Sequence, residues 1–239
     1  MNKSHITETT LELNGKALNP KRVIALEPHV VLEGHNGDMS LAWNKLSRHL
    51  ANPLDSHYSA AKRVLRYLKG TRYQLRYNFS TCTELNLKFY TDASYADDIV
   101  KRRSTTTYLA LANNTPVSWA ISLNRTSLSS CEAEYYGLTG AATDAKWFYS
   151  ILTELGYDKA DLTPLRLFSD NQGVLALATN AGFHRRSKHI DVRYHFIRNW
   201  VDEGFVTVDY INTNYIPTDG LTKALDRIKF TRFLAQINA

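Results

Sequence analysis

The chain has 239 residues, of which 44% are hydrophobic, and it contains 4 Trp and 14 Tyr. This composition can build a packed core, so it excludes a wholly disordered chain and suits one or two domains. The net charge of +6 favours a polyanionic partner. The sequence has no run of eighteen apolar residues, and its first residues lack the apolar core of a signal peptide, so we expect no membrane association.

The cysteines and histidines do not form a metal-binding pattern. Cys82 and Cys131 are spaced neither as a zinc-binding pair nor as a disulfide framework. His184, His189 and His195 match no familiar zinc spacing. We therefore expect no zinc site and an intracellular, reducing environment.

The first part of the chain is expected to contain little regular structure. Residues 1–38 show no sustained hydrophobic period, which indicates a poorly structured tail or the remnant of a truncated domain. Residues 39–83 follow as a helical segment, in which a helix from Asp55 to Lys69 has an apolar side and a basic side. Such a basic side suits a solvated helix face as well as it suits a phosphate-binding face. Its members are Lys62, Arg63, Arg66 and Lys69.

Residues 84–239 predict a single α/β domain. Between Leu85 and Thr91, apolar and polar residues alternate with the two-residue period of a half-buried strand. A hairpin meander followed by alternating helices and strands then indicates a mixed sheet with helices packed on it. The further elements expected are strands at Thr106–Ala112, Val117–Ala120, Leu165–Ser169 and Phe205–Ile211, and helices at Ser130–Leu155, after Asn171 and at Leu221–Ile237.

Acidic residues stand at the ends of two predicted strands. Asp92 closes the first strand and Asp170 closes the fourth, just before a predicted helix. Open α/β sheets bind their ligands at this position. Right-handed crossover of the strand–helix–strand connection allows the two strands to be neighbours. We therefore expect Asp92 and Asp170 to meet.

Two further acids complete the candidate site. Glu134 lies four residues before Leu138 on the apolar stripe of the long helix, whereas Glu132 lies about 200° away on the helical wheel. A carboxylate on a buried face needs a partner, because leaving it unpaired costs several kcal/mol. Asp219 opens the last helical segment. Taken alone, Asp170 and Asp219 could each be a simple helix N-cap.

Several short blocks, in the right order and with the right gaps, resemble a known family. They are YTDASYADD, KRRSTTTY, PVSW, SLSSCEAEYYGL, DNQGVLALA, FHRRSKHIDVRYHFIRNWV and DGLTK. These blocks resemble the ribonuclease H domain of copia-type retrotransposon Pol polyproteins. The stretch from Asn44 to Thr71 is similar to the segment that joins the reverse transcriptase to that domain. The resemblance covers residues 39–233.

The resemblance implies a ribonuclease H-like α/β fold: a five-stranded mixed sheet, three antiparallel strands then two parallel, with helices on both faces. It places the catalytic, metal-binding acids at Asp92, Glu134, Asp170 and Asp219. It further implies two divalent ions, hydrolysis of the RNA strand of an RNA–DNA hybrid, and a reverse transcriptase portion of the same polyprotein as partner. The expected location is the cytoplasm, within a virus-like particle, or the nucleus.

The ligand type and the charges predict the mechanism. Oxygen-only ligands suit Mg²⁺ or Mn²⁺, and crowded carboxylates have raised pKa values unless cations neutralise them. We expect Asp92 to bridge both ions, Glu134 and Asp170 to complete one site each, and Asp219 to help on the water side. Contacts to nucleic acid are expected from three clusters of polar and basic residues. They are Arg102, Arg103 and Ser104; Asn171 and Gln172; and His184, Arg186, Lys188 and His189.

The sequence leaves alternatives open. Residues 95–98 spell the YxDD signature of reverse transcriptases, but they trail a strand and enter a basic stretch, which indicates a chance match in a polar loop. Gly220 stands where the family usually has an aliphatic residue, and Thr107 where it usually has glycine. The Gly220 departure and the truncated front end favour a rival hypothesis, a catalytically silent module that binds hybrid or polymerase. An integrase-like transferase would use three acids and a separate DNA-end-binding domain.

Overall fold

The computed structural model describes residues 12–13, 16–17, 37–71, 85–124, 126–179 and 191–237. The chain divides into two compact units, residues 1–73 and residues 74–239. The boundary expected between residues 83 and 84 lies outside the described residues. Each unit is described by itself.

Unit 1 is a small helical unit. Helix α3 is one residue longer than the predicted helix, and the Tyr67 hydroxyl on α3 donates to Asp38 Oδ2 at 2.7 Å. Leu46 and Ala61 form a small core where α2 meets α3. A short antiparallel strand pair lies within the stretch expected to be poorly structured. The elements are β1 (Glu12–Leu13), β2 (Lys16–Ala17), η1 (Gly37–Met39), α2 (Ser40–Ser47) and α3 (Asp55–Gly70).

Unit 2 is built on a five-stranded sheet with the order β5-β4-β3-β6-β7. The pairs β3–β4 and β4–β5 are antiparallel, whereas β3–β6 and β6–β7 are parallel, which confirms the predicted mixed sheet. The β4–β5 turn places Asn113 and Asn114 at φ values of 50° and 65°, a conformation that asparagine tolerates and that favours tight hairpins. The strands are β3 (Leu87–Ser94), β4 (Thr105–Ala112), β5 (Thr115–Leu123), β6 (Leu165–Ser169) and β7 (Val206–Tyr210).

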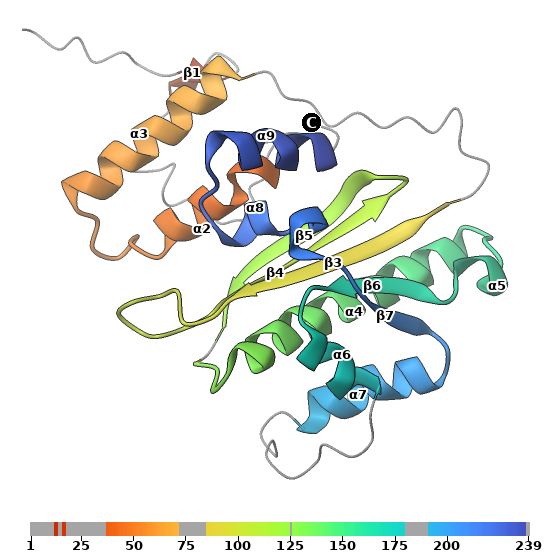
Figure 1. The fold of residues 1–239 in the computed structure, drawn as a ribbon. Helices are drawn as coiled ribbons and strands as arrows, with labels where there is room; N and C mark the ends of the chain where they lie inside the picture. The colour runs from red at the N-terminus through yellow and green to blue at the C-terminus, as the bar shows by residue number, and fades with distance from the viewer. Residues whose placement is uncertain are drawn as a thin grey trace, which may run out of the picture. The chain divides into compact units, whose positions relative to one another are not determined.

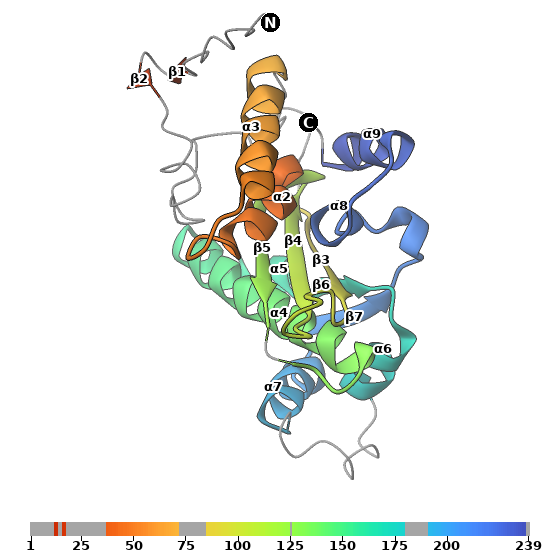
Figure 2. The same ribbon diagram turned by 90° about the vertical axis from the view of Figure 1, so that its left-hand side faces the viewer.

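Helices cover both faces of this sheet (Figures 1 and 2). Figure 2 shows α4 on one side of β3 and β4, with α8 and α9 on the other. Alternate residues of β4 serve the two cores, because Ala110 packs toward α4 and Leu109 toward α9. Among the described residues, no helix has the length and apolar character needed to cross a membrane. The helices are α4 (Ser130–Glu154), α5 (Lys159–Leu162), α6 (Gln172–Thr179), α7 (Asp191–Asp202), η2 (Thr213–Tyr215), α8 (Asp219–Thr222) and α9 (Arg227–Gln236).

Two predicted helices end differently from expectation. Helix α4 stops at Glu154, and Leu155, the last residue of the predicted helix, is 70% exposed. The final helix is not continuous from Leu221 to Ile237, because Lys223 adopts an extended backbone (φ −127°, ψ 145°) and separates α8 from α9. The break lets α9 fold back against α8, which a hydrophobic period alone cannot reveal.

Gly220 is explained by this fold-back. A Cβ atom at position 220 would lie 2.5–2.6 Å from three ring carbons of Phe233 on α9. Phe233 is itself 2% exposed and packs with Leu109 and Leu221 in the core between the sheet and α9. The glycine that departs from the family pattern therefore makes room for an aromatic ring, and it is a packing feature rather than a sign of decay.

We expect Gly220→Ala to lower the free energy of unfolding by about 1–3 kcal/mol, because the added methyl group overpacks the Phe233 ring. Thermal unfolding measures this as a lower Tm, by roughly 2–4 °C for each kcal/mol. Gly70→Ala is the control, because a Cβ there meets nothing within 4 Å. Adding Phe233→Leu should recover part of the loss in the double variant. Additive losses would show that the two positions do not interact.

Candidate active site

Four acids come from four different elements of unit 2. Asp92 lies on β3, Glu134 in the first turns of α4, Asp170 directly after β6, and Asp219 at the start of α8. Strands β3 and β6 are parallel neighbours, with Thr91 opposite Ser169, so the residues that follow reach the same edge of the sheet. Carboxylate oxygens of Asp92, Glu134 and Asp170 all lie within 4.8 Å of one another. The structure thus brings three of the four predicted acids together.

Burial and mutual repulsion dominate the electrostatics of this group. Asp92 is 1% exposed and Glu134 is 7% exposed. Burial, and then the charges of Asp92 and Asp170, raise the pKa of Glu134 to about 9, although the Ala93 amide acts in the opposite direction. Burial likewise raises the pKa of Asp92 to about 6, although Lys223 opposes this rise. Without a bound cation, Asp92 and Glu134 are therefore harder to ionise than free carboxyl groups.

Asp219 lies beside this group and is paired with a lysine. Lys223 Nζ is 2.7 Å from Asp219 Oδ1 and 3.5 Å from Asp92 Oδ2. The Thr222 hydroxyl also donates to Asp92 Oδ2. Burial alone would lower the pKa of Lys223, but the charges of Asp92 and Asp219 outweigh it and raise that pKa. Sequence reasoning missed Lys223, although its spacing of four residues from Asp219 on a helix was a usable signal.

The carboxylates fit a divalent cation. Glu134 Oε2 is buried and has no hydrogen-bond partner, so it is an acceptor held ready for a ligand. Asp92, Glu134 and Asp170 supply only oxygen, which suits Mg²⁺ or Mn²⁺ rather than a softer metal. Asp92 and Asp219 face a common lysine, so they are the pair that could hold a second cation.

Glu132 is buried, contrary to what the helical wheel indicated. Its side chain turns back over the helix start, where it accepts from the Leu128 amide at 2.6 Å and from the Tyr136 hydroxyl at 3.0 Å. Ser129, the N-cap residue, accepts from the Glu132 amide in return. This arrangement fixes the first turn of α4 and so the position of Glu134. The pattern Ser-x-x-Glu could have revealed it.

The loop between β3 and β4 starts beside Asp92 and exposes basic side chains. Arg102 and Arg103 are both exposed, as a contact to nucleic acid requires. Ser104 is fully buried, and its Oγ accepts from the Ala96 amide at 3.1 Å. Any contribution of Ser104 to binding would therefore be indirect, through the shape of the loop.

The YxDD residues have structural partners in this loop. Asp97 Oδ1 accepts from the Thr105 hydroxyl at 2.6 Å. Asp98 Oδ1 accepts from the amides of Val100 and Lys101, both at 3.1 Å. These contacts bind the two aspartates to the loop itself, which supports the interpretation of the signature as a chance match.

The other residues predicted to contact nucleic acid lie partly within and partly outside the described part of the chain. Asn171 Oδ1 accepts from the amides of Gly173 and Val174, so this side chain caps α6. Gln172 is exposed. His184, Arg186, Lys188 and His189 lie outside the described residues.

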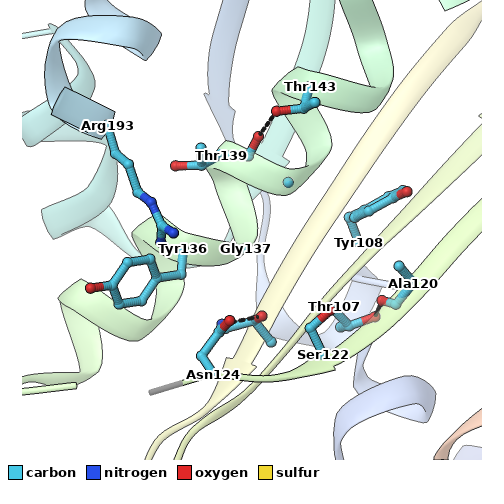
Figure 3. Close-up of a pocket in the computed structure, with 12 residues that line it drawn as sticks. Thr107, Tyr108, Ala120, Ser122, Asn124, Tyr136, Gly137, Thr139, Thr143 and Arg193 are labelled. Atoms are coloured by element: carbon cyan, nitrogen blue, oxygen red, sulfur yellow. Dashed lines mark hydrogen bonds between the residues drawn. The ribbon is translucent and has the colours of Figure 1, made fainter. Parts of the chain in front are cut away.

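A polar groove runs beside α4, one turn beyond Glu134 (Figure 3). Its volume is about 210 Å³, and its lining includes the hydroxyl-bearing residues Thr106, Ser122 and Thr139. Arg193 of α7 stacks on the Tyr136 ring, 4.2 Å from the ring centroid. Sequence reasoning did not single out Arg193, because its position depends on how α7 packs against α4.

The chain is similar in sequence to known proteins. The chain is 38% identical over 201 residues to the retrovirus-related Pol polyprotein from transposon RE2 of Arabidopsis thaliana, a match that covers 84% of this chain. It is 40% identical over 197 residues to the corresponding polyprotein from transposon TNT 1-94 of Nicotiana tabacum, which covers 81% of this chain. In both cases the chain spans 14% of the length of the relative. No protein-family model matches the chain.

The chain also has low-scoring similarities to solved structures. One is the N-terminal RNase H domain of rv2228c from Mycobacterium tuberculosis, with a TM-score of 0.41 and 13% identity. That similarity covers 65% of this chain and 100% of the other.

We expect Glu134→Gln to stabilise the protein in the absence of divalent cations, by about 1–3 kcal/mol near pH 8. The folded protein holds the Glu134 proton up to about pH 9, whereas the unfolded chain releases it near 4.5. The wild type therefore loses stability as pH rises through this window, and the variant loses less, because only the raised pKa of Asp92 remains. Glu132→Gln is the matched control, and it should destabilise by about 1 kcal/mol, since it weakens two hydrogen bonds to a carboxylate.

Chemical denaturation in EDTA measures both variants. A loss of stability in Glu134→Gln at every pH would show that the carboxylate is held by favourable interactions and is not strained by its neighbours.

Proposed function

We propose a catalytic function for this chain, which belongs to the retrovirus-related Pol polyproteins of copia-type transposons. It hydrolyses the RNA strand of RNA–DNA hybrids, as a part of reverse transcription. The observation that carries the proposal is the buried carboxylate group of Asp92, Glu134 and Asp170, in which Glu134 Oε2 has no partner. Such a group destabilises the fold, and a metal-dependent reaction accounts for its presence.

The residues of the proposed active site have different roles. In place of the expectation that Glu134 and Asp170 each complete a separate ion site, we assign Asp92, Glu134 and Asp170 to one divalent ion and Asp92 with Asp219 to a second. Bound divalent ions activate water and stabilise the charge that develops on the leaving oxygen. The Thr222 hydroxyl and the Ala93 amide each bind an oxygen of Asp92 and fix the orientation of its carboxylate. The first turn of α4, fastened by Glu132, does the same for Glu134.

Two surfaces near the acids suit a duplex. The exposed Arg102 and Arg103 leave the sheet from β3, whose end also carries Asp92, so they can bind phosphates. The groove beside α4 is lined by hydroxyl-bearing residues and by Arg193, which suit sugar and phosphate oxygens. We further propose that the reverse transcriptase portion of the polyprotein is the partner, in a virus-like particle in the cytoplasm or in the nucleus.

Cleavage of a labelled RNA–DNA hybrid in Mg²⁺ tests the activity. We expect Asp92→Asn to reduce the rate at least about a hundredfold, because Asp92 is shared by both proposed ion positions. Asp226→Asn is the matched control: Asp226 is an exposed acid that caps α9, and asparagine caps equally well. It should leave the rate unchanged.

Equal rates for wild type and Asp92→Asn would refute the assignment. Salt-dependent binding of hybrid without cleavage by the wild type would instead support the silent binding module.

A second experiment tests whether the loop between β3 and β4, which carries Arg102 and Arg103, contacts the hybrid. We expect the double variant Arg102→Gln, Arg103→Gln to bind hybrid more weakly and to reduce the slope of log K against log salt by roughly 1–2, since each lost phosphate contact contributes less than one unit. Fluorescence anisotropy at several salt concentrations measures the slope. Lys159→Gln is the control, because α5 lies before β6 and therefore at the opposite edge of the sheet from Asp170. An unchanged slope would remove the loop from the interface.

A further inference from the structure

Lys223 places an ammonium group inside the acidic site. It approaches two of the acids, at 2.7 Å from Asp219 Oδ1 and 3.5 Å from Asp92 Oδ2. Its side chain remains 45% exposed, whereas that of Asp92 is only 2% exposed. The lysine thus forms the solvent-facing side of the carboxylate pair and can leave it without disrupting the core.

The three-acid group and the lysine-bound pair share only Asp92. Asp92, Glu134 and Asp170 bring their oxygens within 4.8 Å of one another, and Asp219 is not a member of that group. Lys223 makes ion pairs with Asp92 and Asp219, whereas its charge acts on Glu134 and Asp170 only from a longer distance. A cation that binds Asp92 and Asp219 together must take the place that the ammonium holds, because two positive charges in contact repel strongly in a half-buried site.

We propose that Lys223 is a built-in cation that competes with the second divalent ion and so imposes an order of binding. The first ion binds at Asp92, Glu134 and Asp170, and the second binds between Asp92 and Asp219 only when Lys223 moves out. The inference rests on the metal-site part of the proposed function. It adds a positioning role for Lys223: the lysine holds Asp219 beside Asp92 until the second ion replaces it.

The local structure suits this exchange. Lys223 is the residue at which α8 ends, and its backbone amide still binds the Asp219 carbonyl at 3.0 Å, so its Cα is fixed. The four-carbon side chain carries a strongly hydrated point charge that can swing into solvent at little cost. Thr222, one residue earlier, keeps its own bond to Asp92 in either arrangement. Movement of one side chain is therefore enough, and neither helix needs to shift.

Binding of Mn²⁺ alone, measured by calorimetry and by electron paramagnetic resonance, tests the proposal. We expect two classes of site in the wild type. Lys223→Gln should raise the affinity of the weaker class by roughly tenfold and that of the stronger class by clearly less. Lys223→Arg keeps the charge and should keep the wild-type gap. Lys159→Gln, an exposed lysine at the opposite edge of the sheet, controls for net charge. Asp219→Asn should remove the weaker class.

The possible results distinguish failure of this inference from failure of the proposed function. Equal changes of both affinities in Lys223→Gln, or no change, would overturn the competition. Absence of any Mn²⁺ binding by the wild type would overturn both this inference and the metal-dependent function. The two-class pattern and its response to Lys223→Gln, together with a failure to cut hybrid, would overturn only the proposed activity.

Discussion

Negative charge gathered at one edge of the sheet is the constraint on which the rest of this unit depends. Asp92, Glu134 and Asp170 place oxygens within 4.8 Å of one another, and two of these residues are buried. Neither burial nor proximity favours ionised carboxylates. Neighbouring residues offset the free-energy cost of the buried charge on Asp92. The Ala93 amide and the Thr222 hydroxyl donate hydrogen bonds to its carboxylate, and the Lys223 ammonium faces it. Glu134 Oε2, by contrast, is buried and has no hydrogen-bond partner.

The sequence revealed those parts of the fold that depend on short-range pattern. The alternation in β3 and β6 predicted both strands, and the acid at each strand end predicted where Asp92 and Asp170 would meet. Glu134 was placed by helical period. Glu132 was misplaced, because the wheel treats a side chain as pointing straight out, whereas this one bends back to bind the helix start. The break between α8 and α9 was missed, since apolar spacing continues across it.

Lys223 and Arg193 show a different limit of prediction from sequence. Each acquires its place from contacts between segments far apart in sequence: Lys223 from β3 meeting α8, and Arg193 from α7 meeting α4. The spacing of four residues could have revealed the pairing of Lys223 with Asp219, but no local pattern indicates which distant carboxylate or aromatic ring a charged side chain will face. The residue patterns and the family resemblance both indicated the acids, but neither indicated how this chain balances their charge.

The site therefore has two halves, which are positioned by different parts of the fold. Asp92 and Asp170 are set by strand pairing, and Glu134 by a capped helix that packs on the same strands, so these three share one rigid frame. Asp219 and Lys223 depend instead on α8, a helix of four residues whose Gly220 is covered by Phe233 of α9. Packing in the second core thus positions the half of the site in which the lysine and the second ion compete. Because that half is short and solvent-facing while the first is framed by the sheet, it is the half in which order of binding can be controlled.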